Sequence, residues 1–341
     1  MIKPACLKRG DKVCAISLSS GLAQKYPHRY HVGKRQIERT FDIEIVQSAN
    51  ALREDKWLQQ NPKARADDLM AALLDDSISG IFSIIGGFDS IKLLPFLDFN
   101  VIKNNPKIFL GNSDATVTHF VFSKCGIVSY YGPSIMTGLA ENGGIFEYTA
   151  DYLQKALFCN QSYILVQSGY WVDEFLDWAN PSNQEKNRTI KSNSWQFLQG
   201  DGIVEGELFG GCPEVIDKIK DTVIFPDMHF FENKILFLEI SEEMPHVSWF
   251  ENFLRDLGNR GILNKIKAIL FGRPHNYTLK YEKAMLNIVN KEFDLNTLPI
   301  ITRMDFGHTE PSFVLPYGLS VRIDFGRKCV VVANTTYLEV N

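Results

Sequence analysis

A serine stands at a strand-to-helix turn in this sequence. The apolar residues KIFL (107–110) are followed by GNSDA (111–115) and then by a helix-like pattern. A serine at such a turn has its hydroxyl lifted clear of the sheet, and the next backbone N–H groups lie at a helix N-terminus, where they favour a developing negative charge. Ser113 is therefore a candidate nucleophile, with the N–H of Asp114 as a candidate oxyanion donor. Gly111 and Ala115 supply the small side chains that this crowded turn needs, but G-x-S-x-A lacks the second glycine of the G-x-S-x-G elbow. Taken alone, the motif favours a serine or aspartate that caps the next helix.

A nucleophilic serine needs a base and an acid that orients the base. His308 is the candidate base, because it lies in the turn-rich segment MDFGHTEP (304–311) after an apolar run. Glu239 is the candidate acid. It ends the apolar run ILFLE (235–239), where a carboxylate is partly desolvated unless it has a partner, and strand ends are where α/β proteins gather site residues. The alternatives are a hydrogen-bonded loop histidine and an edge-strand glutamate that faces water.

Two glycines end the strand-like run GIFSII (80–85) that precedes the serine segment. Without side chains, their backbone N–H groups can approach a ligand closely. One of them is a candidate second oxyanion donor beside Asp114. The alternative is a plain turn at the end of a strand.

The elements in the first half alternate between strands and helices. Short apolar or alternating runs predict strands at 12–18, 41–46, 80–85 and 107–110, and helical patterns cover 61–76 and 89–97. Strands that alternate with helices favour parallel βαβ units with helices on both faces of the sheet. The fold class is therefore α/β, with a doubly wound, mostly parallel sheet in the N-terminal domain.

The second half reads as richer in strands. Strand-like runs occupy 200–211, 234–240 and 265–271, a helix is predicted over 249–259, and a hairpin closes the chain with strands at 319–325 and 329–333. The polar stretch 180–194 predicts a long loop and is flanked by Trp171, Trp178 and Trp195. We predict an N-terminal domain over residues 1–165, an inter-domain loop over 166–199 and a β-rich C-terminal domain over 200–341.

Composition narrows the functional classes. The 341 residues suffice for two domains, 45% are hydrophobic and 22% are charged, and the net charge of −4 gives no electrostatic reason to expect nucleic acid or an anionic membrane as partner. No apolar stretch approaches the roughly 20 residues of a spanning helix, and the N-terminus does not read as a signal peptide. The six cysteines form no CxxC pair. We expect reduced thiols in the cytoplasm, no metal and no cofactor.

The sequence resembles the LD-carboxypeptidase family of serine peptidases, and within it the microcin-C immunity branch. The resemblance covers nearly the whole chain in ordered blocks: GDKVCAISLSSG, SIIGGFDSIKLLPFLDF, IFLGNSDAT, YYGPS, GGCPEVI, ILFLEISEE, GILNKIKAILFGRP and PIITRMDFGHTEP. It implies that the C-terminal domain is a swivelling-barrel-like α/β domain, and that the protein is a homodimer.

The resemblance also implies roles for individual residues. The nucleophile falls on Ser113, the acid on Glu239 and the base on His308, and the oxyanion donors fall on the backbone of Gly87 and Asp114. The order Ser, Glu, His agrees with the candidates taken from the residues themselves.

The branch bears on the substrate. Murein LD-carboxypeptidases remove the terminal D-alanine of a peptidoglycan tetrapeptide, whereas the immunity branch cleaves the bond between an aspartyl group and a nucleotide-like moiety in processed microcin C. That branch has a longer inter-domain loop with a tryptophan that stacks on the base. Trp178 is the first candidate for this role and Trp195 the second; the alternative for both is packing in a core or interface.

Three other hypotheses stay open from the sequence. A murein LD-carboxypeptidase acting in cell-wall recycling is the alternative within the family, and an α/β-hydrolase esterase is disfavoured by the missing elbow glycine. A non-catalytic ligand-binding protein with the same cleft is disfavoured because all three candidate triad residues are present.

Overall fold

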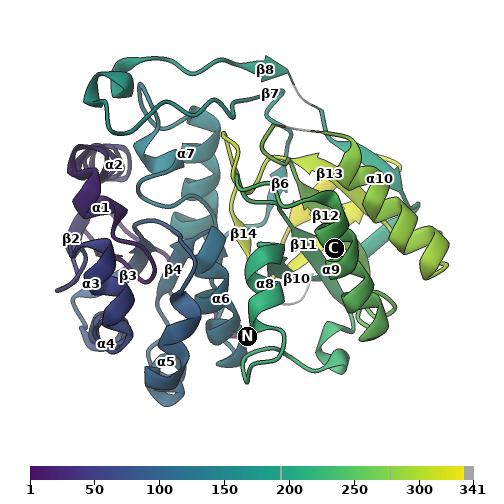
Figure 1. Cartoon of the computed structure of the whole chain (residues 1–341), viewed down its shortest axis with the longest axis horizontal. Helices are drawn as coiled ribbons and strands as arrows, with labels where there is room; N and C mark the ends of the chain where they lie inside the picture. The colour runs from purple at the N-terminus through teal and green to yellow at the C-terminus, as the bar shows by residue number, and fades with distance from the viewer. Residues whose placement is uncertain (193, 277, 334–341) are drawn as a thin grey trace.

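A computed structural model of the chain describes residues 1–192, 194–276 and 278–333. These residues form a six-stranded sheet in one half, an eight-stranded sheet in the other, and a separate two-stranded pair, β7 (Tyr170–Trp171) with β8 (Lys191–Ser192). Figure 1 shows the two halves side by side, the first in purple to blue and the second in green to yellow. The prediction of a parallel-rich N-terminal α/β half and a β-rich C-terminal half is confirmed.

The six-stranded sheet has the order β14-β5-β4-β3-β1-β2, and all its neighbours are parallel except β14 with β5. Its strands are β1 (Lys12–Ile16), β2 (Glu44–Gln47), β3 (Ile78–Ser83), β4 (Ile108–Gly111), β5 (Tyr130–Tyr131) and β14 (Leu315–Pro316). The helices of this half are α1 (Leu22–Lys25), α2 (Pro27–Phe41), α3 (Asp55–Gln60), α4 (Pro62–Leu74), α5 (Phe99–Asn104), α6 (Thr116–Lys124) and α7 (Glu147–Leu153).

Helices cover both faces of this sheet, as a doubly wound fold requires. Successive side chains of β1 point to opposite faces, so Cys14 and Ile16 join one buried cluster, whereas Val13 and Ala15 join the other. The first cluster contains residues of α4 and α6, and the second contains residues of α2 and α7. The period-two pattern of β1 thus fixes which helices lie on which side.

The eight-stranded sheet has the order β6-β16-β15-β10-β11-β12-β13-β9, with β10 to β13 parallel in its centre. Its strands are β6 (Tyr163–Leu165), β9 (Gln196–Gln199), β10 (Ile203–Gly211), β11 (Lys234–Leu238), β12 (Ala268–Gly272), β13 (Ile300–Met304), β15 (Ser320–Asp324) and β16 (Cys329–Val332). The helices of this half are α8 (Pro213–Ile219), α9 (Val247–Asn259) and α10 (Lys280–Leu286). The predicted closing hairpin is confirmed as β15 with β16.

Two strands do not belong to the sheet that their position in the sequence predicts. β6 precedes residue 166 but pairs with β16, and β14 follows residue 200 but pairs with β5. The proposed domain limits of 165 and 200 therefore stay a prediction.

Three elements differ from their predicted form. The segment predicted as a helix over 89–97 is a 3₁₀ helix, Ser90–Phe96, with a proline inside it. The strand predicted over 41–46 begins later, because α2 continues to Phe41 and Asp42 ends it in a left-handed conformation. The polar loop over 180–194 contains a 3₁₀ turn, Pro181–Glu185, and β8 (Lys191–Ser192), which pairs with β7 (Tyr170–Trp171); residue 193 lies outside the described residues.

The carboxyl ends of the parallel strands from both sheets meet in one place. β3 and β4 of the first sheet lead into residues 84–87 and 112–115, and β11 and β13 of the second lead into residues 239–246 and 305–310. The segment with β7 and β8 runs along the top of the view in Figure 1, over both halves. Among the described helices, none is long and apolar enough to cross a membrane.

Candidate active site

Ser113 lies at the tip of a strand-turn-helix unit, as predicted. It follows β4 and opens a short 3₁₀ turn, Ser113–Ala115, that leads into α6. Its φ is +59°, a left-handed conformation that costs a non-glycine residue about 1–2 kcal/mol. Such strain persists only where the surroundings enforce it, and it is concentrated at functional sites.

The surroundings of this turn are crowded enough to enforce that conformation. A Cβ on Gly111 would lie 2.8 Å from Cβ of Ser83 and 2.9 Å from Cβ of Ala115. The helix-capping alternative is wrong for this turn, because neither the 3₁₀ turn nor α6 has a side-chain cap hydrogen bond. The carboxylate of Asp114 instead accepts hydrogen bonds from the Ser19 hydroxyl at 2.6 Å and the Ser90 N–H at 2.9 Å.

The double glycine after β3 lies directly against the candidate nucleophile. A Cβ on Gly86 would lie 2.8 Å from Cβ and 2.9 Å from Oγ of Ser113, and 3.5 Å from the backbone nitrogen of Asp114. Gly87 has a φ of +153°, and a Cβ there would lie 2.4 Å from Oγ of Ser19. Only glycine allows the backbone to pass this close to Ser113.

Glu239 and His308 form the predicted pair. Glu239 directly follows β11 and is fully buried, and its Oε2 accepts a hydrogen bond of 2.6 Å from Nδ1 of His308. His308 follows β13, and its side chain is 9% exposed. A Cβ on Gly307 would lie 2.7 Å from Oε2 of Glu239, so a glycine is required for the backbone at 307 to approach the Glu239 carboxylate this closely.

The charge of this pair is set by two opposing effects. Burial lowers the pKa of His308, but the negative charges of Glu239 and, beyond it, Glu242 outweigh burial and raise that pKa to about 10. The carboxylate of Glu239 therefore favours the protonated form of the imidazole, which is the form that arises when His308 acts as a base.

Tyr131 of β5 connects the acid to the nucleophile. Its hydroxyl donates a hydrogen bond to Oε1 of Glu239 and accepts one of 3.0 Å from the backbone N–H of Ser113. Burial, followed by the charge of Glu239, raises the pKa of Tyr131 well above its ordinary value, so the hydroxyl keeps its proton. This residue falls in the quoted block YYGPS, but sequence reasoning assigned it no role.

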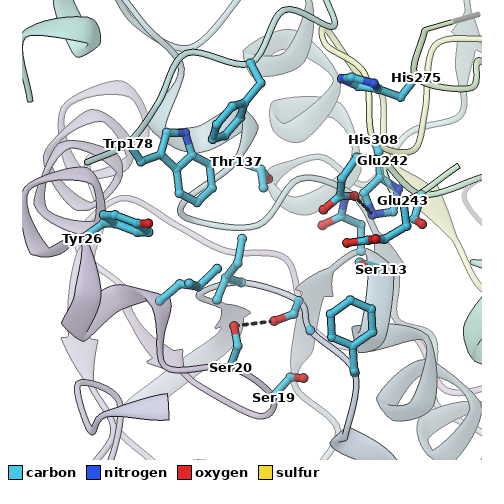
Figure 2. Close-up of a pocket in the computed structure, with 18 of the residues that line it drawn as sticks. Ser19, Ser20, Tyr26, Ser113, Thr137, Trp178, Glu242, Glu243, His275 and His308 are labelled. Atoms are coloured by element: carbon cyan, nitrogen blue, oxygen red, sulfur yellow. Dashed lines mark hydrogen bonds and ion pairs between the residues drawn. The ribbon is translucent and has the colours of Figure 1, made fainter. Parts of the chain in front are cut away.

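One cavity of about 770 Å³ lies beside the candidate nucleophile and base. Its lining includes the backbone of Gly86 and Gly87, the side chains of Ser113 and His308, and acidic residues on the loop after β11. Figure 2 shows His308, Glu242 and Glu243 close together near Ser113, with Tyr26 and Trp178 on the opposite side of the cavity. The volume is in the range of pockets that hold a drug-sized ligand.

Trp178 lies in an aromatic part of the cavity wall. Tyr26 meets it edge-on, with ring centroids 6.0 Å apart and an interplanar angle of 85°, and Phe175 lies 5.9 Å away. The guanidinium of Arg29 lies over the indole ring, 4.6 Å from its centroid. Flat aromatic surfaces of this kind stack well on planar heterocycles. Sequence reasoning found Trp178 but missed its neighbours Tyr26 and Arg29.

Trp195 does not line this cavity. It is 8% exposed, its indole N–H donates a 2.7 Å hydrogen bond to Asp305, and its ring meets Phe313 edge-on. The role as second candidate for substrate stacking is therefore not supported by its place in the fold, and the packing alternative fits it. Asp305 needs such donors because it is buried beside Arg273.

The structure also bears on a metal site. Within the described residues, no group of three or more His, Cys, Asp or Glu side chains is placed to hold a metal ion. His119, in the first turn of α6, is buried and forms hydrogen bonds with the Ser129 hydroxyl at 2.8 Å and the carbonyl of Gly111 at 2.9 Å. Its role is to hold the end of β4 in place.

Both halves of the chain match models of a known protein family. Residues 13–132 match the LD-carboxypeptidase N-terminal domain, and residues 205–323 match the LD-carboxypeptidase C-terminal domain. The chain belongs to the LD-carboxypeptidase family. The fold and the serine-peptidase class of hydrolase follow from this membership.

Individual members of the LD-carboxypeptidase family extend this finding. The chain is 30% identical to a carboxypeptidase-named protein of Treponema pallidum, over 97% of this chain and 95% of that one. It is 27% identical to the microcin C7 self-immunity protein MccF of Escherichia coli, over 96% and 94% of the two chains. Its structure is similar to the crystal structure of an MccF-like protein from Streptococcus pneumoniae in complex with AMP, with a TM-score of 0.87. The two sequences are 28% identical, and the match covers 95% of this chain and 99% of that one.

Proposed function

We propose that this protein is a serine amidase that cleaves the amide bond between an aspartyl-type acyl group and a nucleotide-like moiety, as in processed microcin C. Ser113 is the nucleophile, His308 the base and Glu239 the acid of the proposed triad. The alternative is a murein tetrapeptide LD-carboxypeptidase that removes terminal D-alanine in cell-wall recycling.

One observation carries the catalytic part of the proposal. Ser113 comes from the first sheet and the hydrogen-bonded pair of His308 and Glu239 comes from the second, yet Ser113 and His308 line the same cavity. Three residues more than 60 positions apart in the sequence are brought to one place, and one of them is a strained serine. A structural role explains neither the strain nor the shared cavity.

The proposed mechanism follows acyl-transfer chemistry. His308 takes the proton of Ser113 as the hydroxyl oxygen attacks the scissile carbonyl, and the N–H groups of Gly87 and Asp114 stabilise the oxyanion. Each such donor is typically worth about 10²–10³ in rate. His308 then gives its proton to the leaving nitrogen, and water attacks the acyl-enzyme by the same route. Glu239 orients the imidazole and stabilises its positive charge.

The aromatic wall around Trp178 supports a nucleotide-like leaving group. Trp178, Tyr26 and Phe175 offer flat apolar surface in the same cavity as Ser113, and the leaving part of a murein peptide, D-alanine, has no planar ring to use it. A related structure is in complex with AMP. The stacking role of Trp178 rests on these two observations.

The proposal includes the setting of the protein. It includes a cytoplasmic location, and the resemblance to the family supports a homodimer. Analytical ultracentrifugation tests the oligomeric state: a sedimenting species of the mass of a single 38.8 kDa chain at micromolar concentration would refute the dimer.

The experiment that tests the function is mass spectrometry of two incubations with the purified protein, with Ser113→Ala as control. One contains a murein tetrapeptide and the other contains aspartyl sulfamoyl adenosine, an aspartyl-adenylate analogue. Release of aspartate alone supports the proposed substrate, and loss of D-alanine alone supports the alternative. Cleavage of neither refutes both substrate classes, and equal cleavage by Ser113→Ala refutes the nucleophile.

A further inference from the structure

The imidazole of His308 lies between two carboxylates. Nδ1 donates to Glu239, and Nε2 lies 3.2 Å from Oε2 of Glu242. Nε2 is the nitrogen that must accept the proton of Ser113 in the proposed mechanism. In this structure Glu242 stands beside the atom that the reaction needs.

The charged groups around His308 are mostly acidic. Glu239 faces it from the end of β11, Glu242 from the loop that follows, and Glu214 of α8 and Glu310 lie within electrostatic reach. Burial lowers the pKa of His308, but these charges raise it to about 10. Nε2 must face the hydroxyl of Ser113 to accept its proton, so the carboxylate of Glu242 has to leave this nitrogen before Ser113 can be activated.

Glu242 is the carboxylate that is free to move. Its side chain is 61% exposed, whereas Glu239 is fully buried and is also held by Tyr131. In the described part of the chain, neither Glu242 nor its neighbour Glu243 has a lysine or arginine partner in an ion pair, and both line the cavity.

Two other acids of this cavity are neutralised by the protein itself. Asp89 pairs with Arg65 and Lys92, and Asp173 pairs with Lys191. The loop that carries Glu242 and Glu243, in contrast, places negative charge without such a partner close to the nucleophile. A cationic group on the acyl part of the substrate would complement it.

We propose that Glu242 binds a free ammonium group on the acyl part of the substrate and leaves His308 when it does so. This inference rests on the proposed function and specifies its substrate class as acyl groups that carry an amine, such as aspartyl. When Glu242 turns to the ammonium, it leaves Nε2 of His308, which lowers the pKa of His308 and lets Nε2 face the hydroxyl of Ser113 and accept its proton. Glu242 is then a specificity-determining residue.

The test compares two ligands that differ only in the amine: aspartyl sulfamoyl adenosine and its succinyl counterpart. Binding is measured by calorimetry in Ser113→Ala, which cannot turn over. We expect the aspartyl ligand to bind about two- to fivefold more tightly, the range expected for a partly exposed ion pair. Adding Glu242→Gln should abolish that preference. Adding Glu243→Gln, which removes the same charge from the same loop, should keep it.

A second readout separates this role from simple charge attraction. The titration of His308 is followed by NMR of ¹³C-labelled imidazole in the Ser113→Ala protein. The aspartyl ligand should lower the pKa of His308, because Glu242 leaves it, and the succinyl ligand should not. Glu242→Gln should lower that pKa by about one unit without ligand.

Three results would overturn the inference: a preference for the aspartyl ligand that survives Glu242→Gln, an unchanged pKa of His308 when this ligand is bound, or no binding of the aspartyl ligand. Failure of the proposed function is seen separately, as absence of cleavage by the intact enzyme, while the binding and titration results still decide the role of Glu242.

Discussion

The hydroxyl of Tyr131 donates a hydrogen bond to Glu239 and thereby joins the first sheet to the acid of the second. The same hydroxyl accepts the N–H of Ser113 at 3.0 Å, so a single buried side chain fixes the nucleophile turn relative to the acid and base. Glu239 is fully buried and needs both of its partners, Tyr131 and His308, to offset desolvation. The triad geometry is therefore set across the interface between the halves.

Replacing this tyrosine tests whether the connection matters for the reaction. Tyr131→Phe removes a hydrogen bond to a buried carboxylate, which is worth about 1.5–3 kcal/mol and corresponds to a fall of about 10- to 100-fold in kcat. The substrate does not contact this hydroxyl, so KM should change little. Steady-state kinetics check the result, with Tyr130→Phe as matched control. If kcat and KM fell together, and by the same factor in Tyr131→Phe and Tyr130→Phe, the result would contradict the positioning role.

The strained conformation of Ser113 predicts a trade-off between stability and activity. Both Ser113→Ala and Ser113→Gly should lower turnover at least about 10³-fold. Glycine adopts the φ of +59° without the steric cost, although it gains more entropy in the unfolded chain. Ser113→Gly should therefore have a free energy of unfolding about 0.5–1 kcal/mol higher than Ser113→Ala. Urea denaturation measures this, and equal stability would show that the turn is not strained.

The contact between Gly86 and Ser113 predicts a selective loss of reactivity. In Gly86→Ala the new methyl group would meet Oγ of Ser113 at 2.9 Å and displace it. A displacement of about 1 Å can cost 10²-fold in rate. Labelling by a fluorophosphonate probe should slow by about tenfold or more. Gly80→Ala, on the same strand β3, is the control, since its methyl group would meet its nearest neighbour, Cδ2 of Leu7, at an ordinary 3.4 Å. Equal labelling rates in the two variants would refute the contact.

Substitution of Trp178 should weaken ligand binding, whereas substitution of Trp195 should lower stability. Trp178→Ala should weaken the binding of AMP by about 10- to 100-fold, since stacking on a base is worth about 1–3 kcal/mol, and Trp178→Phe should retain part of it. Trp195→Ala should lower the melting temperature instead, because it leaves buried Asp305 without one of its donors. Calorimetry and thermal denaturation give both numbers. AMP binding that depends on Trp195 and not on Trp178 would reverse the assignment.

His119 predicts a pH dependence of stability. Burial lowers its pKa to about 3, although the carbonyl of Gly111 opposes this. The unfolded chain takes up a proton below pH 6.5 that the folded chain refuses until about pH 3, so this residue's contribution is complete above pH 6.5 and is lost progressively as the pH falls towards 3. In His119→Gln the free energy of unfolding should fall less steeply over this range. Denaturant titrations at several pH values test this, and an unchanged slope would contradict it.

The sequence by itself determined the local structure of the site. The glycine and alanine around Ser113 predict a crowded strand-to-helix turn, and the carboxylate at the end of an apolar run predicts a buried, partnered Glu239. The alternation of strand-like and helix-like segments in the first half predicts a sheet with two covered faces. These features depend on residues near one another in the chain, where side-chain size and backbone freedom decide the outcome.

Only the tertiary structure decided which of these features meet. The sequence assigns no role to Tyr131 or Glu242, because their contacts are with residues more than 60 positions away, Glu239 and His308. Trp178 and Trp195 flank the same polar loop in the sequence, yet one lines the cavity and the other is buried against Asp305. Such differences depend on how the two sheets pack together. The burial of a side chain and the charge around it are set by every segment of the chain that packs against it, and the spacing of residues along the sequence does not reveal which segments those are.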